Sequence, residues 1–225
     1  MCLFFREEKQ ICYHPRMFTD PFPASDFDDW ADSYDDSVQS DDFPFTGYRQ
    51  VLQTIFNMAG LPSGADVLDL GTGTGSLAAL FIDAGCRVWG TDFSEEMLVR
   101  ARAKLPTAVF GRADLREALP AGFPQRFDAI VSAYTFHHFP LQQKVNLVHR
   151  FLVEHAQPGA SLLIGDIAFP DSATQDVLIR ALGDAWEQEY YWLADETAAA
   201  FAAAGMLAEF TLISHCAGIF QIRFA

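Results

Sequence analysis

The stretch VLDLGTGTG at residues 67–75 decides the fold that we predict for this chain. The apolar run before Gly71 predicts a short buried strand, and a helical pattern of apolar residues begins near Ser76, directly after the glycines. Glycines at alternate positions leave the main chain of the turn without side chains, so a ligand can lie against the N–H groups of the turn and of the helix N-terminus. We therefore expect the principal ligand site at this turn.

Acidic residues follow the next two predicted strands as well. The stretch 86–91 predicts a strand that ends on Asp92, and a short strand at 108–110 leads to Asp114. The carboxyl ends of parallel strands open on one crevice, where a carboxylate can accept hydrogen bonds from both hydroxyls of a ribose. Asp92 has a second possible role at the N-terminus of the following helix, which opens with Ser94. The spacing predicts a nucleoside site and leaves both roles open.

Three motifs occur in a fixed order along the chain. They are Asp-x-Gly-x-Gly-x-Gly at 69–75, the segment Gly90–Leu98, and Ala113–Leu115. Together they resemble motifs I, II and III of the class I S-adenosylmethionine (SAM) dependent methyltransferases. The dinucleotide fingerprint requires Gly or Ala three residues after Gly73, where this chain has Ser76. An NAD-dependent oxidoreductase and a non-catalytic SAM-binding regulatory module remain the alternatives.

The resemblance extends from Trp30 to the C-terminus and implies an α/β fold. We expect a Rossmann-like, seven-stranded, mostly parallel sheet with helices on both faces and an antiparallel last strand. Strands predicted at 208–214 and 218–224 supply the final antiparallel pair. The implied activity is methyl transfer from SAM to a small soluble acceptor through an oxygen or nitrogen nucleophile.

The N-terminal region predicts an appendage to this domain. Residues 1–24 contain three prolines and no clean period, so we expect a flexible arm there; a translation start at Met17 remains an alternative. Residues 25–225 are expected to form a single methyltransferase domain, in which residues 25–60 make a helical lid that opens with an acidic helix at Ser25. The lid segment around Trp30 resembles that of small-molecule methyltransferases.

The resemblance also implies the residues that contact SAM. Motif I contributes an acid and the glycine turn, motif II a carboxylate for the ribose, and motif III a carboxylate and a backbone N–H for the adenine. The predicted cofactor contacts are Tyr34, Asp69, Gly71, Gly73, Asp92, Phe93, Asp114, Leu115 and Ser132.

Acceptor handling is predicted after the fourth and fifth strands. The pattern Ser-x-x-x-x-His-His-Phe at 132–139 resembles small-molecule methyltransferases, and His137 and His138 are candidate general bases. Asp166 ends the apolar strand predicted at 161–165 and is a second candidate base or substrate anchor. Adjacent side chains usually diverge, so we expect no metal chelated by this histidine pair and no metal site elsewhere.

Composition limits the partners. The chain of 225 residues carries a formal net charge of −15 and no stripe of Lys or Arg, which disfavours nucleic acid and anionic membranes as partners. The four cysteines are widely spaced and fit neither a zinc motif nor a disulfide framework, and no run is long enough to span a bilayer. We expect a cytoplasmic protein; the sequence leaves its oligomeric state open.

Overall fold

The computed structural model describes residues 34–38 and 42–225. The predicted arm over residues 1–24 and the predicted start of the acidic helix at Ser25 lie outside the described residues. Within the range 25–60 that is predicted to form a lid, the structure has a short helix, α2 (Tyr34–Ser37), and the longer α3 (Tyr48–Ala59). No helix of the described part combines the length and apolar character that a membrane span requires.

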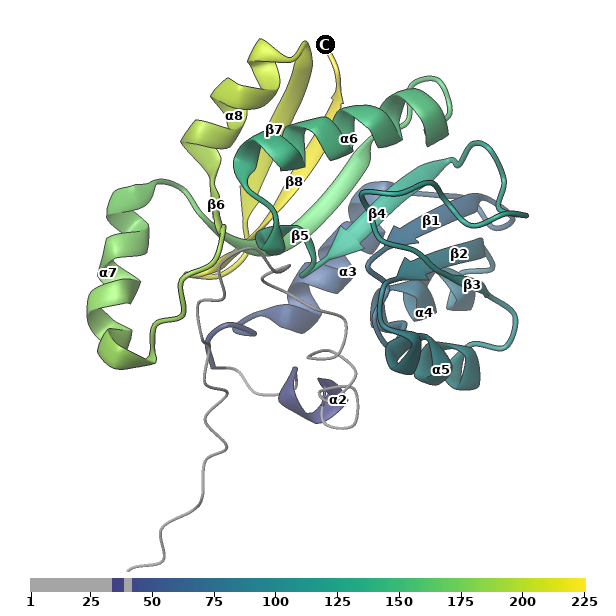
Figure 1. The fold of residues 1–225 in the computed structure, drawn as a ribbon, viewed down its shortest axis with the longest axis horizontal. Coiled ribbons are helices and arrows are strands. Elements are labelled where there is room, and N and C mark those ends of the chain that lie inside the picture. Colours follow the sequence, from purple (N-terminus) through teal and green to yellow (C-terminus); the bar gives the residue numbers. More distant parts are fainter. Residues whose placement is uncertain (1–33, 39–41) are drawn as a thin grey trace, which may run out of the picture.

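One sheet organises the chain, and seven of its strands follow the order β3-β2-β1-β4-β5-β8-β7 (Figure 1). Neighbouring strands are parallel except that β8 runs antiparallel to both β5 and β7. The two-residue β6 pairs with the end of β5 and adds an eighth strand off this path. The strands are β1 (Asp66–Leu70), β2 (Arg87–Asp92), β3 (Val109–Arg112), β4 (Ala129–Ala133), β5 (Leu162–Phe169), β6 (Trp192–Leu193), β7 (Met206–Leu212) and β8 (Ala217–Phe224). The expected sheet, with its antiparallel last strand, is confirmed.

Helices cover both faces of this sheet (Figure 1). Buried residues of α3 and α4 pack together on one face, and those of α6 and α8 belong to a second core on the other. Because β4 and β5 are buried on both faces, they are almost continuously apolar. The remaining helices are α4 (Ser76–Asp83), α5 (Glu95–Lys104), η1 (Phe136–His138), α6 (Leu141–His155), α7 (Ser172–Leu182), η2 (Gly183–Ala185) and α8 (Ala194–Ala203).

A glycine in β5 determines how closely α3 approaches the sheet. A Cβ atom at Gly165 would lie 2.3 Å from Val51 Cγ1 and 2.7 Å from Ile55 Cδ1, both in α3. Real Cβ atoms do not approach that closely, so only glycine permits this contact. This close contact holds α3 against the centre of the sheet.

Candidate functional site

A cavity of about 660 Å³ opens at the carboxyl ends of β1, β2 and β4. The glycine turn and the strand-end carboxylates line one part of it, and the two histidines of η1 line another. Aromatic residues from the segment between α2 and α3 and from the start of α3 line it, among them Phe43, Phe45 and Tyr48. The cavity lies where the sheet order reverses between β1 and β4, which is the ligand-binding crevice of open α/β sheets.

The glycine turn is built to bring the main chain close to its neighbours. Gly71 has a φ of +66°, and a Cβ atom there would lie 2.2 Å from Thr135 Oγ1. Thr72 donates a hydrogen bond of 2.7 Å to Asp69 Oδ2 behind the turn. Burial, together with the charge of Asp92, raises the pKa of Asp69 to about 7. A cationic group of a ligand entering here would favour the ionised form of Asp69.

Asp92 is bound to the glycine turn rather than serving as a helix cap. Its Oδ2 accepts a hydrogen bond of 2.9 Å from Gly73 N, and its Oδ1 accepts one of 2.9 Å from Ser94 N. Ser94 is the N-cap of α5, since its hydroxyl oxygen accepts from Met97 N. A carboxylate oxygen can accept more than one hydrogen bond, and Asp92 lines the cavity. This arrangement suits a vicinal diol.

Asp114 is paired with an arginine that the sequence analysis did not consider. Its carboxylate accepts hydrogen bonds from the Arg116 backbone N–H and guanidinium. Partial burial opposes ionisation, but the Arg116 guanidinium outweighs it and lowers the pKa of Asp114. Phe93 and Leu115 line the cavity beside this pair. An adenine amino group bound here would share the Asp114 carboxylate with Arg116.

Eight of the nine residues predicted to contact the cofactor line the cavity, and the exception is Ser132. Ser132 is fully buried, and its hydroxyl donates a hydrogen bond of 2.7 Å to Leu70 O in the neighbouring strand. The hydroxyl therefore ties β4 to β1, and Ser132 is removed from the candidate contacts. Tyr34 does line the cavity, with its ring edge-on to Phe45 at a centroid distance of 6.3 Å.

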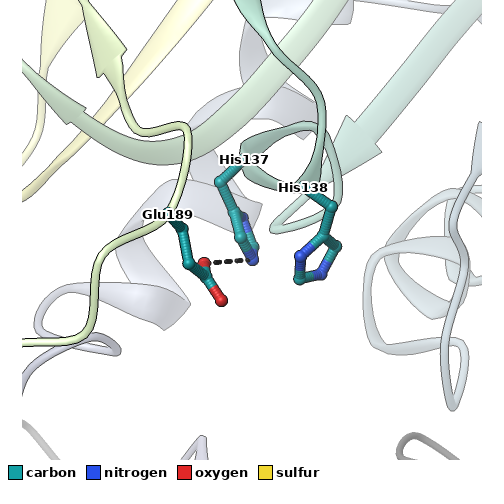
Figure 2. Close-up of side chains that lie close together, drawn as sticks. All are labelled: His137, His138 and Glu189. Atoms are coloured by element: carbon teal, nitrogen blue, oxygen red, sulfur yellow. Dashed lines mark ion pairs between the residues drawn. The ribbon is translucent and has the colours of Figure 1, made fainter. Parts of the chain in front are cut away.

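The two histidines lie together, contrary to the expectation that their side chains diverge. Both belong to the single turn η1, their ring centroids are 4.1 Å apart, and both rings point the same way in Figure 2. Both line the cavity. Burial, and next the neighbouring His137, lower the pKa of His138 well below its ordinary value. The pair thus brings two imidazole rings to the cavity wall.

Asp166 does not reach the cavity, so its predicted role as a base or substrate anchor is wrong. The residue is fully buried in β5, and its carboxylate accepts four hydrogen bonds. Oδ1 accepts from His137 Nδ1 at 2.6 Å and from Ile167 N at 2.8 Å, while Oδ2 accepts from His137 N and from Trp192 Nε1, each at 3.0 Å. Asp166 therefore fixes the orientation of His137 from behind.

Glu189 completes this end of the cavity, and the sequence analysis missed it. Its Oε2 lies 3.4 Å from His137 Nε2 (Figure 2), whereas Asp166 pairs with the other ring nitrogen, Nδ1. Burial opposes protonation of His137, but the two carboxylates outweigh it and raise the pKa of His137. Burial raises the pKa of Glu189. No motif marks Glu189, because it lies in an irregular segment before β6.

Tyr134 is a second residue that the sequence did not single out. It follows β4 with a φ of +52°, the one positive value outside glycine among the described residues. Its ring packs against Tyr48 at 5.1 Å between centroids, and its buried hydroxyl has no hydrogen-bond partner within residues 34–38 and 42–225. Backbone strain of this kind is typical of functional sites. The cavity thus contains an aromatic hydroxyl group that a ligand can engage.

Comparison with known proteins assigns a family to this site. The profile described as a methyltransferase domain matches residues 67–158, which contain the glycine turn and both histidines. An uncharacterised methyltransferase of Geobacillus sp. strain WCH70 is 34% identical over 176 residues, covering 76% of this chain and 78% of the relative. The chain belongs to the SAM-dependent methyltransferases. The alternative that the glycine turn belongs to an NAD-dependent oxidoreductase is therefore excluded.

Solved structures agree with the fold of this methyltransferase. A complex of DhpI with SAM and HEP superposes with a TM-score of 0.68 at 19% identity, over 88% of this chain and 94% of the other. Magnesium protoporphyrin IX methyltransferase from Synechocystis PCC 6803, with bound SAH, gives 0.65 at 18% identity, over 90% and 100% of the two chains. At these identities the likeness establishes the shared sheet and helices.

Proposed function

We propose that this methyltransferase transfers the methyl group of SAM to a small-molecule acceptor through an oxygen or nitrogen atom. The observation that carries the proposal is the division of one cavity into two parts. One part has the glycine turn and Asp92, which suit the methyl donor, and the other has the His137–His138 pair, which suits a nucleophile. A donor and an acceptor bound in one cavity can be held in line for a direct displacement.

The part of the cavity at the glycine turn, which we call the donor end, has groups that can bind SAM. A Cβ atom at Gly73 would meet nothing within 4 Å, so the turn leaves open space beside the Asp92 carboxylate. Asp69 lies behind the turn, where an ionised carboxylate can stabilise the cationic amino or sulfonium group of the donor. The donor supplies a methyl group on a leaving sulfur that is already activated, so these residues mainly need to bind and orient it.

The cavity favours a small acceptor over a macromolecule. Its volume of about 660 Å³ lies within the range of small-ligand sites. The carboxylates in its wall outnumber the single arginine: they are Asp69, Asp92, Asp114, Glu187 and Glu189. A phosphate backbone would be repelled by this wall and by the net charge of −15. An uncharged or cationic small molecule fits it better.

Aromatic rings line the acceptor end. Phe43 stacks on Trp186 at 5.5 Å between centroids, and Trp186 meets Tyr191 edge-on at 5.1 Å. Phe43 and Tyr191 both line the cavity. An acceptor with an apolar or planar body can pack against these rings while its nucleophilic atom points to the histidine pair. We infer an acceptor that is amphipathic, with one oxygen or nitrogen group to be methylated.

A transfer assay with labelled donor tests this function. The purified chain is incubated with methyl-labelled SAM and, separately, with the low-molecular-mass, protein and RNA fractions of a bacterial extract. We expect label in the low-molecular-mass fraction, and much less of it with Asp92→Asn. Label that appears only in the protein or RNA fraction would overturn the small-molecule proposal, whereas SAM binding without any transfer would favour a regulatory module.

A further inference from the structure

Three side chains at the acceptor end have the arrangement of a metal site. The ligating atoms of His137, His138 and Glu189 all lie within 4.8 Å of one another. Figure 2 shows the three side chains converging, with the histidines on one turn and Glu189 on a separate segment. We propose that they bind a divalent transition-metal ion of the first row. The role of the metal in binding the acceptor rests on the proposed function, whereas metal binding itself does not depend on it.

The distance between two of these atoms already matches a metal-bound geometry. His137 Nε2 and Glu189 Oε2 are 3.4 Å apart. Two ligands on a tetrahedral ion at about 2.0–2.1 Å each are separated by roughly 3.3 Å. A cation can therefore replace a proton between these two atoms with little movement. A ring nitrogen of His138 lies within 4.8 Å of both of these atoms and supplies the third ligand of the proposed site.

A hydrogen bond behind the site selects the ligating nitrogen of His137. Asp166 Oδ1 accepts from His137 Nδ1 at 2.6 Å, which leaves Nε2 directed at Glu189. Metal-binding histidines commonly donate their other N–H to a carboxylate in this way, because the hydrogen bond fixes the tautomer and the ring orientation. Asp166 is itself fully buried and held by the Trp192 indole and two backbone N–H groups. The first ligand is thus preorganised.

The donor set and the local charge determine which ions fit. Two imidazole nitrogens and one carboxylate suit Zn²⁺, Fe²⁺, Co²⁺ or Ni²⁺, whereas Mg²⁺ and Ca²⁺ prefer all-oxygen sites. Asp166 and Glu189 bring two negative charges, and Glu187 lies near enough to act on Glu189. The opposing cation is Lys144, whose Nζ donates to Tyr190 O and lies 4.0 Å from the centroid of the Trp192 ring. These contacts hold the Lys144 ammonium group against the Tyr190 carbonyl oxygen and the Trp192 ring.

Three protein ligands leave at least one coordination position for the acceptor. All three residues line the cavity that also contains the glycine turn. A bound cation would hold an acceptor oxygen or nitrogen and favour its deprotonated form, which is the better nucleophile. The acceptor's proton would pass to solvent water; the methyl carbon then passes from sulfur to the deprotonated atom, and the sulfur keeps the electron pair of the broken bond. The metal proposal therefore narrows the acceptor to molecules with a metal-binding heteroatom.

Metal titration of the full chain tests the site without any acceptor. The protein is stripped with a chelator and titrated by calorimetry with Zn²⁺ alone, and Co²⁺ is used alone to detect ligand-field bands. We expect one ion per chain and no comparable response to Mg²⁺. Glu189→Gln and His138→Ala should remove this binding, and Asp166→Asn should weaken it about 10- to 100-fold through the His137 orientation.

Matched variants distinguish this site from other binders in the chain. Glu187→Gln removes a carboxylate from the same cavity wall, and His149→Ala removes a histidine that packs against Phe224. His149→Ala should bind Zn²⁺ like the wild type, and Glu187→Gln, which loses a charge that acts on Glu189 but no ligand atom, should retain stoichiometric binding. Binding that survives Glu189→Gln and His138→Ala, or no stoichiometric binding at all, would overturn the proposal and leave a plain ion pair between His137 and its two carboxylates. SAM titration of the same stripped protein tests donor binding separately, and the labelled-transfer assay tests the proposed function.

Discussion

Replacing Asp92 with asparagine tests the donor site most directly. The Asp92 carboxylate accepts hydrogen bonds from the backbone N–H groups of Gly73 and Ser94, and we expect it also to accept from the ribose hydroxyls of the donor. In Asp92→Asn one carboxylate oxygen becomes an NH₂ group, which cannot accept the hydrogen bond from the backbone N–H of Gly73 or Ser94. The variant loses one ribose acceptor outright, and the other becomes a neutral acceptor.

The magnitude follows from the strength of these bonds. A hydrogen bond to a charged acceptor contributes about 1.5–3 kcal/mol, and a neutral one about half as much. The expected loss is roughly 2.5–4 kcal/mol of binding free energy, which corresponds to about 10²- to 10³-fold weaker SAM and SAH binding. Asp92 is 7% exposed, so water will not substitute fully for the lost acceptor.

Calorimetric titration with SAM and with SAH measures this loss, and denaturant unfolding of the free variant shows whether the turn still folds. Asp176→Asn, which removes one exposed carboxylate from α7, is the charge-matched control and should bind like the wild type. Affinity within about threefold of the wild type, in an Asp92→Asn protein that unfolds normally, would refute the ribose assignment.

Three further variants test the structure around the site. Gly71→Ala puts a methyl group 2.2 Å from Thr135 Oγ1 at a φ of +66°. In a denaturant titration this variant should lower the free energy of unfolding by about 2–5 kcal/mol. Gly122→Ala is the control, because Gly122 has a φ of +91° and open space around it, and it should lower the free energy of unfolding by only about 1–2 kcal/mol. Asp166→Asn leaves two N–H donors without an acceptor whichever oxygen is replaced, and should cost about 2–6 kcal/mol by the same measurement; an unchanged unfolding midpoint would contradict the buried network. Because the pKa of Asp69 is raised to about 7 in the fold, the folded state of the free protein holds an extra proton between about pH 4 and pH 7, and Asp69 makes the protein less stable as the pH rises through that window. Asp69→Asn should flatten this fall in unfolding free energy measured against pH, and an identical pH profile would show that Asp69 ionises normally.

The sequence could predict residues that meet in one cavity at the donor end because their signals are local. The glycine turn, the acid at the end of β2 and the Asp114-Leu115 pair each lie within a few residues of a strand whose apolar pattern is plain. Eight of nine predicted contacts accordingly line one cavity. Ser132 failed for a physical reason: β4 is buried on both faces, so alternation along the strand cannot show which side a residue faces.

The acceptor end was harder to predict because its contacts join distant segments. His137 and Asp166 are visible as candidates at strand ends, but their hydrogen bond, and the burial that removes Asp166 from the cavity, depend on how η1 packs against β5. Nothing local distinguishes Glu189 from neighbouring acids such as Glu187. Tyr134 adopts its positive φ only because the surrounding structure holds it there.

By itself, the sequence determined the order of strands and helices, the glycine turn and the family. Periodicity and turn chemistry are properties of neighbouring residues and need no knowledge of the distant chain. Only the tertiary structure decided that one carboxylate is buried behind His137 while another, Glu189, faces it across the imidazole ring. The reason is that burial and pairing of charged groups depend on which segments the packed sheet brings together, and those lie up to 52 residues apart between His137 and Glu189.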